Sequence, residues 1–162
     1  MTNNDVLRSL RYTFNFDDAE MISIFELAEH KVSRELVSQW LKKDDDQSFK
    51  ECQGVELCIF LNGLINKNRG KKDGPQVEPQ KWMNNNIIFK KLKIALDLKS
   101  DQVIEIMKLA DFDISSHELS AFFRKKGHKN YRTCKDQILR NFLKGLQLKH
   151  RPEEEGSIDK NW

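Results

Sequence analysis

Two halves of this chain repeat one another, and the repeat limits the possible folds more than any other feature of the sequence. Aligning the 162 residues with themselves at an offset of 82 superposes identical and conservatively exchanged residues in both halves. Core positions that recur at one spacing indicate a structural unit that occurs twice. The clearest trace is the run FLNGL at 60–64, which returns as FLKGL at 142–146. Identical pairs include Asn3/Asn85, Asn4/Asn86, Leu10/Leu92, Ile24/Ile106, Ala28/Ala110 and Ser33/Ser115.

The same alignment predicts one additional residue in the second copy, near the third helix of the repeat. Identical residues match best there at an offset of 83, and the offset returns to 82 at Phe49 and Tyr131. We therefore expect an insertion in the second copy. The pairs at the longer offset are Glu35/Glu118, Leu36/Leu119, Lys42/Lys125 and Lys43/Lys126.

Each copy is predicted to fold as four α-helices without a sheet. Apolar residues recur at three- and four-residue intervals, and no segment alternates apolar and polar residues over the length of a strand. Asp17 or Asp18 is expected to cap the second helix, with Ser100 as its counterpart, and Ser33 and Ser115 are expected to cap the third. The third helix should carry Leu36 and Trp40, or Leu119 and Phe123. The central fourth helix should carry Leu57, Phe60, Leu61 and Leu64, or Leu139, Phe142, Leu143 and Leu146.

The chain is divided by this pattern into a first repeat (1–68), a linker (69–84), a second repeat (85–150) and a flexible tail (151–162). Glycine and proline in the linker cannot continue a helix. The first repeat has eight basic and twelve acidic side chains, a net charge of −4, whereas the second has fourteen and seven, a net charge of +7. A unit of about seventy residues buries too little surface to be stable on its own. The two pseudo-symmetric repeats are therefore expected to pack together.

Several classes of protein find no support in the sequence. Three cysteines, Cys52, Cys58 and Cys134, with no CxxC motif and no histidine at ligand spacing, predict reduced structural thiols rather than disulfides or a zinc site. No apolar run approaches the roughly 18 residues of a membrane helix, and no secretion signal begins the chain. Scattered histidines and the lack of a phosphate-binding glycine motif argue against catalysis. We expect a cytoplasmic protein that is not an enzyme and needs no cofactor.

Two stretches resemble a bacterial family. These are Trp40-Leu41-Lys42-Lys43-Asp44-Asp45-Asp46 with Phe49, Cys52 and FLNGL, and His128-Lys129-Asn130-Tyr131-Arg132 with Cys134 and FLKGL. They are similar to the YehS-like proteins, a family of unknown function. The resemblance covers essentially the whole chain, including its duplication, and implies no activity, cofactor or site.

The basic loop, residues 124–132, is the strongest candidate for a binding site. Cationic side chains gathered beside an aromatic ring could bind phosphates while the ring of Tyr131 stacks on a base. The plainer interpretation is that Tyr131 belongs to the core, as does Phe49 at the equivalent position of the first repeat, and that the cationic side chains are solvated. The candidate nucleic-acid-binding residues are Arg124, Lys125, Lys126, His128, Lys129, Tyr131 and Arg132.

The acidic loop, residues 42–47, occupies the matching place in the first repeat and contains Asp44, Asp45 and Asp46. It lacks the glycine and the glutamate of a calcium-binding EF-hand loop, so no metal site is expected. It could instead meet the basic loop of another copy or a protein partner. Trp82, at the end of the linker, is expected either to staple the linker to the repeats or to anchor a partner.

Two functions remain open at this stage. A nucleic-acid-binding module is favoured by the charge of the second repeat, and the acidic first repeat suits a short or structured nucleic acid better than a long duplex. A protein adaptor or a self-assembling structural protein would use the loops of opposite charge. An enzyme would require a pocket with convergent polar groups between the repeats.

Overall fold

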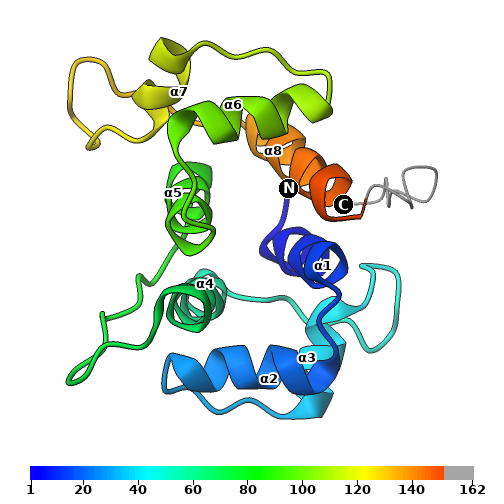
Figure 1. Ribbon diagram of the computed structural model, residues 1–162. Coiled ribbons are helices and arrows are strands. Elements are labelled where there is room, and N and C mark those ends of the chain that lie inside the picture. The colour runs from blue at the N-terminus through cyan, green and yellow to red at the C-terminus, as the bar shows by residue number, and fades with distance from the viewer. Residues whose placement is uncertain (152–162) are drawn as a thin grey trace. The chain divides into compact units, whose positions relative to one another are not determined.

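The computed structural model describes residues 1–151, and within them all regular structure is α-helical. The flexible tail expected at 151–162 lies, beyond Arg151, outside the described residues. The described part separates into two compact units, the first spanning Met1–Met83 and the second beginning at Asn84. The helices are α1 (Asn3–Phe14), α2 (Asp18–Leu27), α3 (Arg34–Leu41), α4 (Gly54–Arg69), α5 (Asn85–Ala95), α6 (Ser100–Leu109), α7 (Ser116–Phe122) and α8 (Asp136–His150) (Figure 1). The all-α fold with a duplicated four-helix unit is confirmed.

The closest packing in each unit is between its second and fourth helices. In the first unit α4 packs on α2 and α1, and α3 packs on α2 and α1. In the second unit α8 packs on α6 and α5, and α7 packs on α6. Aromatic rings fill both cores, with Phe25 lying 5.2 Å from Phe60 and Phe89 lying 4.6 Å from Phe142 between ring centroids. The residues expected on the fourth helix are buried, as predicted, because that helix contacts two others in its unit.

The two units keep one register throughout, so the predicted insertion in the second copy is wrong. The backbone amide of Lys50 donates to the carbonyl of Gln39, and the amide of Arg132 donates to that of Ala121, at an offset of 82 in both residues. Trp40 therefore corresponds to Phe122, not to Phe123, and the buried Val37 corresponds to Leu119. The sequence alignment failed here because the equivalent core residues differ in identity, while residues one position away, such as Glu35 and Glu118 or Leu36 and Leu119, match by chance.

A buried asparagine ties each first helix to the loop before the fourth. The Asn4 side-chain amide donates to the carbonyls of Trp40 and Lys50, both at 2.9 Å, and its oxygen accepts from the amide of Cys52 at 2.9 Å. Asn86 repeats the arrangement with Phe122 (3.0 Å), Arg132 (2.8 Å) and Cys134 (2.9 Å). Backbone groups of an irregular buried segment need such partners, so the asparagine positions the loop that follows the third helix.

One glycine in each fourth helix allows close backbone packing. A Cβ built at Gly63 would lie 1.9 Å from the carbonyl oxygen of Ile24, and one at Gly145 would lie 2.1 Å from that of Ile106. No side chain fits in that space. This close contact, between α4 and α2 and between α8 and α6, explains why the FLxGL run has glycine in both repeats.

Helix starts follow the expected caps with one exception. Asp17, Ser33 and Ser115 cap their helices, each side chain accepting an amide three residues on. Ser100 is not a cap. It is the first residue of α6, and the N-cap is Lys99, whose amide donates to the side chain of Gln102 at 2.8 Å.

The segment between the units begins one residue later than expected, because α4 continues through Arg69. It packs on the first unit: Asn66 donates to the side chain of Gln76 at 3.0 Å, and the backbone of Trp82 and Met83 lies against Gly54. The indole ring of Trp82 does not serve as a buried staple, since the residue is 60% exposed. The backbone contact with Gly54 holds this end of the segment to the first unit.

Candidate functional site

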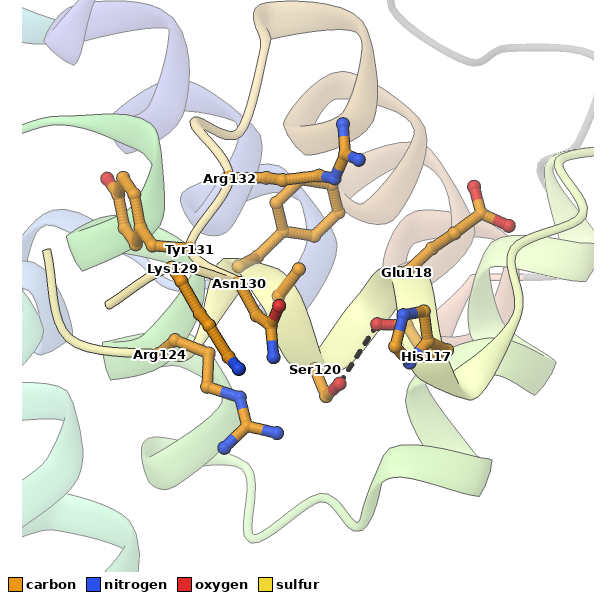
Figure 2. Close-up of a pocket in the computed structure, with 10 residues that line it drawn as sticks. His117, Glu118, Ser120, Arg124, Lys129, Asn130, Tyr131 and Arg132 are labelled. Atoms are coloured by element: carbon orange, nitrogen blue, oxygen red, sulfur yellow. Dashed lines mark hydrogen bonds between the residues drawn. The ribbon is translucent and has the colours of Figure 1, made fainter. Parts of the chain in front are cut away.

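A hollow of about 490 Å³ lies beside α7 in the second unit and is called here the α7 hollow (Figure 2). Its volume falls in the range of small-ligand sites. One side is formed by α7 and the other by the basic loop. Its lining residues are His117, Glu118, Ser120, Ala121, Phe122, Arg124, Lys129, Asn130, Tyr131 and Arg132.

The structure brings only part of the predicted basic cluster together. Four of the seven candidates line the α7 hollow: Arg124, Lys129, Tyr131 and Arg132. The other three candidates, Lys125, Lys126 and His128, are exposed on the same loop but do not line the hollow. The loop therefore presents two groups of cations, one around a concave site and one on its outer surface.

Tight turns give the basic loop its shape. The amide of His128 donates to the carbonyl of Lys125 at 3.0 Å, and the amide of Tyr131 donates to that of His128 at 2.9 Å. Gly127 sits between them with a φ of +98°, a conformation that favours glycine. The Nδ1 atom of His128 accepts the amide of Asn130 at 3.0 Å. His128 thus acts within the loop as a turn-forming residue and orients the segment that carries Lys129 and Asn130.

The functional ends of three side chains share one region of the α7 hollow. Figure 2 shows the Arg124 guanidinium, the Lys129 ammonium and the Asn130 amide directed into the same space, while Arg132 extends in another direction. The hydroxyl of Ser120 borders this space, but its proton is donated to the carbonyl of His117 at 2.9 Å. Arginine, lysine and amide groups are all hydrogen-bond donors, so the site offers donors and positive charge to an anion.

The cations of this site have no acidic partner within residues 1–151. Neither Arg124 nor Lys129 forms an ion pair there, although Arg8 pairs with Asp5 and Lys71 with Glu29 in the first unit. The carboxylate of Glu118 lines the hollow but points away from Arg124 and Lys129 in Figure 2. Both positive charges therefore remain available to a ligand.

The equivalent loop of the first unit has the same turns with different chemistry. At the position of His128 it carries Asp46, whose carboxylate accepts from the amide of Ser48 at 2.8 Å and from the hydroxyl of Ser48 at 2.7 Å. These hydrogen bonds lower the pKa of Asp46 below its usual value. Asp44, Asp45 and Asp46 are all exposed. In place of Lys129 and Asn130 the first unit has Gln47 and Ser48, which carry no positive charge.

Tyr131 is half-buried, as is Phe49 in the first unit. Tyr131 also lines the α7 hollow, so its side chain is neither fully buried nor fully exposed there. Both interpretations of this residue, as a packing residue and as a stacking platform, accordingly remain predictions.

Two of the three cysteines are poorly suited to nucleophilic chemistry. Cys52 and Cys134 are buried, and burial raises the pKa of each thiol to about 12. A protonated thiol is a weak nucleophile and a poor metal ligand. Over the described range, no three His, Cys, Asp or Glu side chains form a group that could hold a metal ion.

Sequence reasoning missed the α7 side of the site. His117, Ser120 and Asn130 were not recognised as candidates, and Glu118 was considered only as part of a capping box, a role it has. Asn130 lies inside the basic loop and could have been found there. The contribution of α7 had no signal in the sequence, because it depends on how the loop folds back onto that helix.

Comparisons with known proteins agree with this architecture. A family model described as "Protein of unknown function (DUF1456)" matches residues 3–70 and again residues 85–151, which correspond to the two repeats. The chain belongs to this family. It is also similar to the Uncharacterized protein YehS of Escherichia coli (strain K12), with 42% identity over 147 residues that cover 90% of this chain and 94% of that protein. The resemblance to YehS-like proteins is thus confirmed. No solved structure matches the chain.

In the part of the chain that the structure describes, none of the helices has both the length and the apolar character needed to cross a bilayer.

Proposed function

We propose that this chain is a non-enzymatic, cytoplasmic nucleic-acid-binding module of bacteria, and that its second repeat contacts phosphates through the basic loop. The observation that carries the proposal is the convergence of Arg124 and Lys129 in the α7 hollow without acidic partners among the described residues. Phosphate contacts by lysine and arginine supply most of the affinity in binding that is independent of sequence.

The outer cations of the basic loop support this proposal. Lys125 and Lys126 are exposed beside the α7 hollow and can reach phosphates that neighbour the one held inside. Tyr131, at the edge of the hollow, offers part of its ring to a base. The net charge of −4 on the first repeat opposes a long duplex, so a short or structured nucleic acid is the better ligand.

The test is a salt titration of binding to short RNA and DNA, as single strands and duplexes, with the nuclease-treated protein. A variant with Arg124, Lys125 and Arg132 changed to glutamate should bind much more weakly. If three contacts to a single strand are lost, the wild type should lose about twentyfold more affinity than the variant between about 50 and 200 mM salt.

The duplication provides a matched control. Lys42, Lys43 and Lys50 occupy the equivalent positions of the first repeat, so changing them to glutamate alters the net charge by the same amount. This control should retain most of the affinity if the basic loop is the site. Equal losses in both variants would mean that only the total charge matters, and the proposal would be wrong.

A second function is favoured by a different observation. Structurally equivalent positions carry Asp44, Asp45 and Asp46 in one repeat and Lys126, Gly127 and His128 in the other. Complementary loops of this kind support head-to-tail self-association or binding of a protein partner. Sedimentation at increasing protein concentration separates the two functions: a rising mass that the D44K/D45K variant abolishes would favour assembly.

A further inference from the structure

We infer that the α7 hollow holds a phosphate monoester at the end of a nucleic-acid strand, and does not hold a phosphodiester within the strand. The inference rests on the proposed function and specifies which chemical group of the nucleic acid the site receives. It follows from the charge and the hydrogen-bond donors of the hollow.

The charge of the site matches a terminal phosphate. Arg124 and Lys129 place two positive charges around one space, and neither is neutralised by an acidic group within residues 1–151. A phosphate monoester carries about −1.5 to −2 at neutral pH, whereas each internal diester carries −1. Two converging cations are therefore fully compensated by a monoester and only partly by a diester.

The donors also exceed what a diester can accept. A guanidinium has five N–H donors, an ammonium three and a side-chain amide two. Arg124, Lys129 and Asn130 direct these groups to one space. A terminal phosphate offers three unesterified oxygens, and arginine can bind two of them at once. An internal phosphate has only two such oxygens and can accept fewer of these hydrogen bonds.

The surroundings of the hollow can also receive the rest of a strand that ends there. Residues of α7 form one side, with Ala121 and Phe122 buried behind it, and the basic loop forms the other side. When a terminal phosphate is held in the hollow, the next phosphates of the strand can meet Lys125 and Lys126 on the outer surface of the loop.

The first repeat shows how the site could be removed with little change in structure. It forms the same turns with Gln47 and Ser48 at the positions of Lys129 and Asn130. Replacing Lys129 with glutamine and Asn130 with serine therefore introduces residues that this loop already accommodates elsewhere in the chain. The variant should fold and should lack one cation and the amide of the site.

The experiment compares single strands of one sequence, about twelve nucleotides long, that end in a 5′-phosphate, a 3′-phosphate or two hydroxyl groups. Each carries a fluorescent label at the end that is not varied, and binding is followed by anisotropy. We expect at least one phosphorylated strand to bind about tenfold more tightly than the hydroxyl-ended strand, because charge-assisted hydrogen bonds form only with the terminal group.

Variants identify the group responsible. The K129Q/N130S variant should lose the preference for a phosphorylated end. The K126Q variant removes a cation from the same loop but outside the hollow, so it should weaken all strands similarly and keep the preference. Loss of the preference in K126Q but not in K129Q/N130S would overturn the assignment of the hollow.

The remaining outcomes separate this inference from the proposed function. Salt-sensitive binding with equal affinity for all ends would overturn the inference and leave the proposed function intact. No binding of any strand at low salt would overturn both. A phosphoserine peptide that binds as tightly as the phosphorylated strand would overturn nucleic acid as the source of the monoester.

Discussion

The side-chain amide of Asn4 donates a hydrogen bond of 2.9 Å to the backbone carbonyl of Trp40, thirty-six residues further along the chain. Asn86 makes the same bond to Phe122 in the second unit, at 3.0 Å. Because Trp40 lies one residue before the end of α3 and Phe122 ends α7, just before the acidic and basic loops, these asparagines fix the point from which each loop departs. The position of the α7 hollow thus depends on a buried amide far away in sequence.

Removing this amide should destabilise either unit severely. In an Asn86→Ala variant, the carbonyls of Phe122 and Arg132 and the amide of Cys134 would lose their partner in the protein interior. We expect the free energy of unfolding to fall by about 3 kcal/mol, because unsatisfied buried polar groups cost more than the net gain of a hydrogen bond. Urea denaturation measures this change.

Asn85 provides the control for that experiment. Its side chain is only partly buried and donates to the carbonyl of Cys134 at 3.0 Å and to the exposed carboxylate of Asp136 at 2.8 Å. Asn85→Ala should cost about 1 kcal/mol. Similar losses in the two variants would show that the buried network has no special role.

Gly145→Ala should be strongly destabilising despite the higher helix propensity of alanine. The new Cβ would lie 2.1 Å from the carbonyl oxygen of Ile106, so α6 and α8 would have to separate. The gain of about 1 kcal/mol in propensity cannot offset the overpacking, and a net loss of about 2 kcal/mol or more is expected from thermal or urea unfolding. Lys144→Ala, at the exposed neighbouring position, should change stability by less than about 0.5 kcal/mol. A neutral G145A variant would contradict the close contact.

The buried thiols should make the protein less stable at high pH. Burial raises the pKa of Cys52 and Cys134 from 9.0 to about 12, so the folded state retains two protons that the unfolded state releases above pH 9. Their contribution is intact below about pH 9, and each thiol then costs about 1.4 kcal/mol per pH unit as the pH rises toward 12.

The measurement is urea unfolding at about pH 8 and pH 11 for the wild type and a C52A/C134A variant, which controls for the titration of lysines. The wild type should lose more stability between the two conditions than the variant. Equal losses would show that these thiols are not protected from ionisation. At neutral pH, both should also resist alkylation in the folded protein.

A Tyr131→Ala variant distinguishes between two roles of this ring, stacking on a base and packing against the protein. If the exposed part of its ring stacks on a base, Tyr131→Ala should weaken single-strand binding by about tenfold, which corresponds to the lower end of measured stacking energies. Phe49→Ala is the matched control in the first repeat and should lower stability without a comparable effect on binding. If both variants lose only stability, Tyr131 is a packing residue.

The local features of this protein were determined by its sequence alone. Apolar spacing predicted four helices in each repeat, and Asp17, Ser33 and Ser115 were correctly identified as caps, because periodicity and capping act over a few neighbouring residues. The duplication was also visible in the sequence, because two copies of one unit repeat their core positions in the same order. That the repeats pack against each other stays a prediction.

Tertiary structure decided what depends on distant residues. It showed that the two units share one register, that Lys99 rather than Ser100 caps α6, and that the ring of Trp82 is exposed. It also selected Arg124, Lys129 and Asn130 from the basic loop and set them against α7, whereas Lys125, Lys126 and His128 remained outside the hollow. Side chains separated along the chain meet only through the folding of the backbone between them, and a buried amide such as Asn86 exerts its effect on residues 36 to 48 positions away. No local pattern in the sequence records those distances.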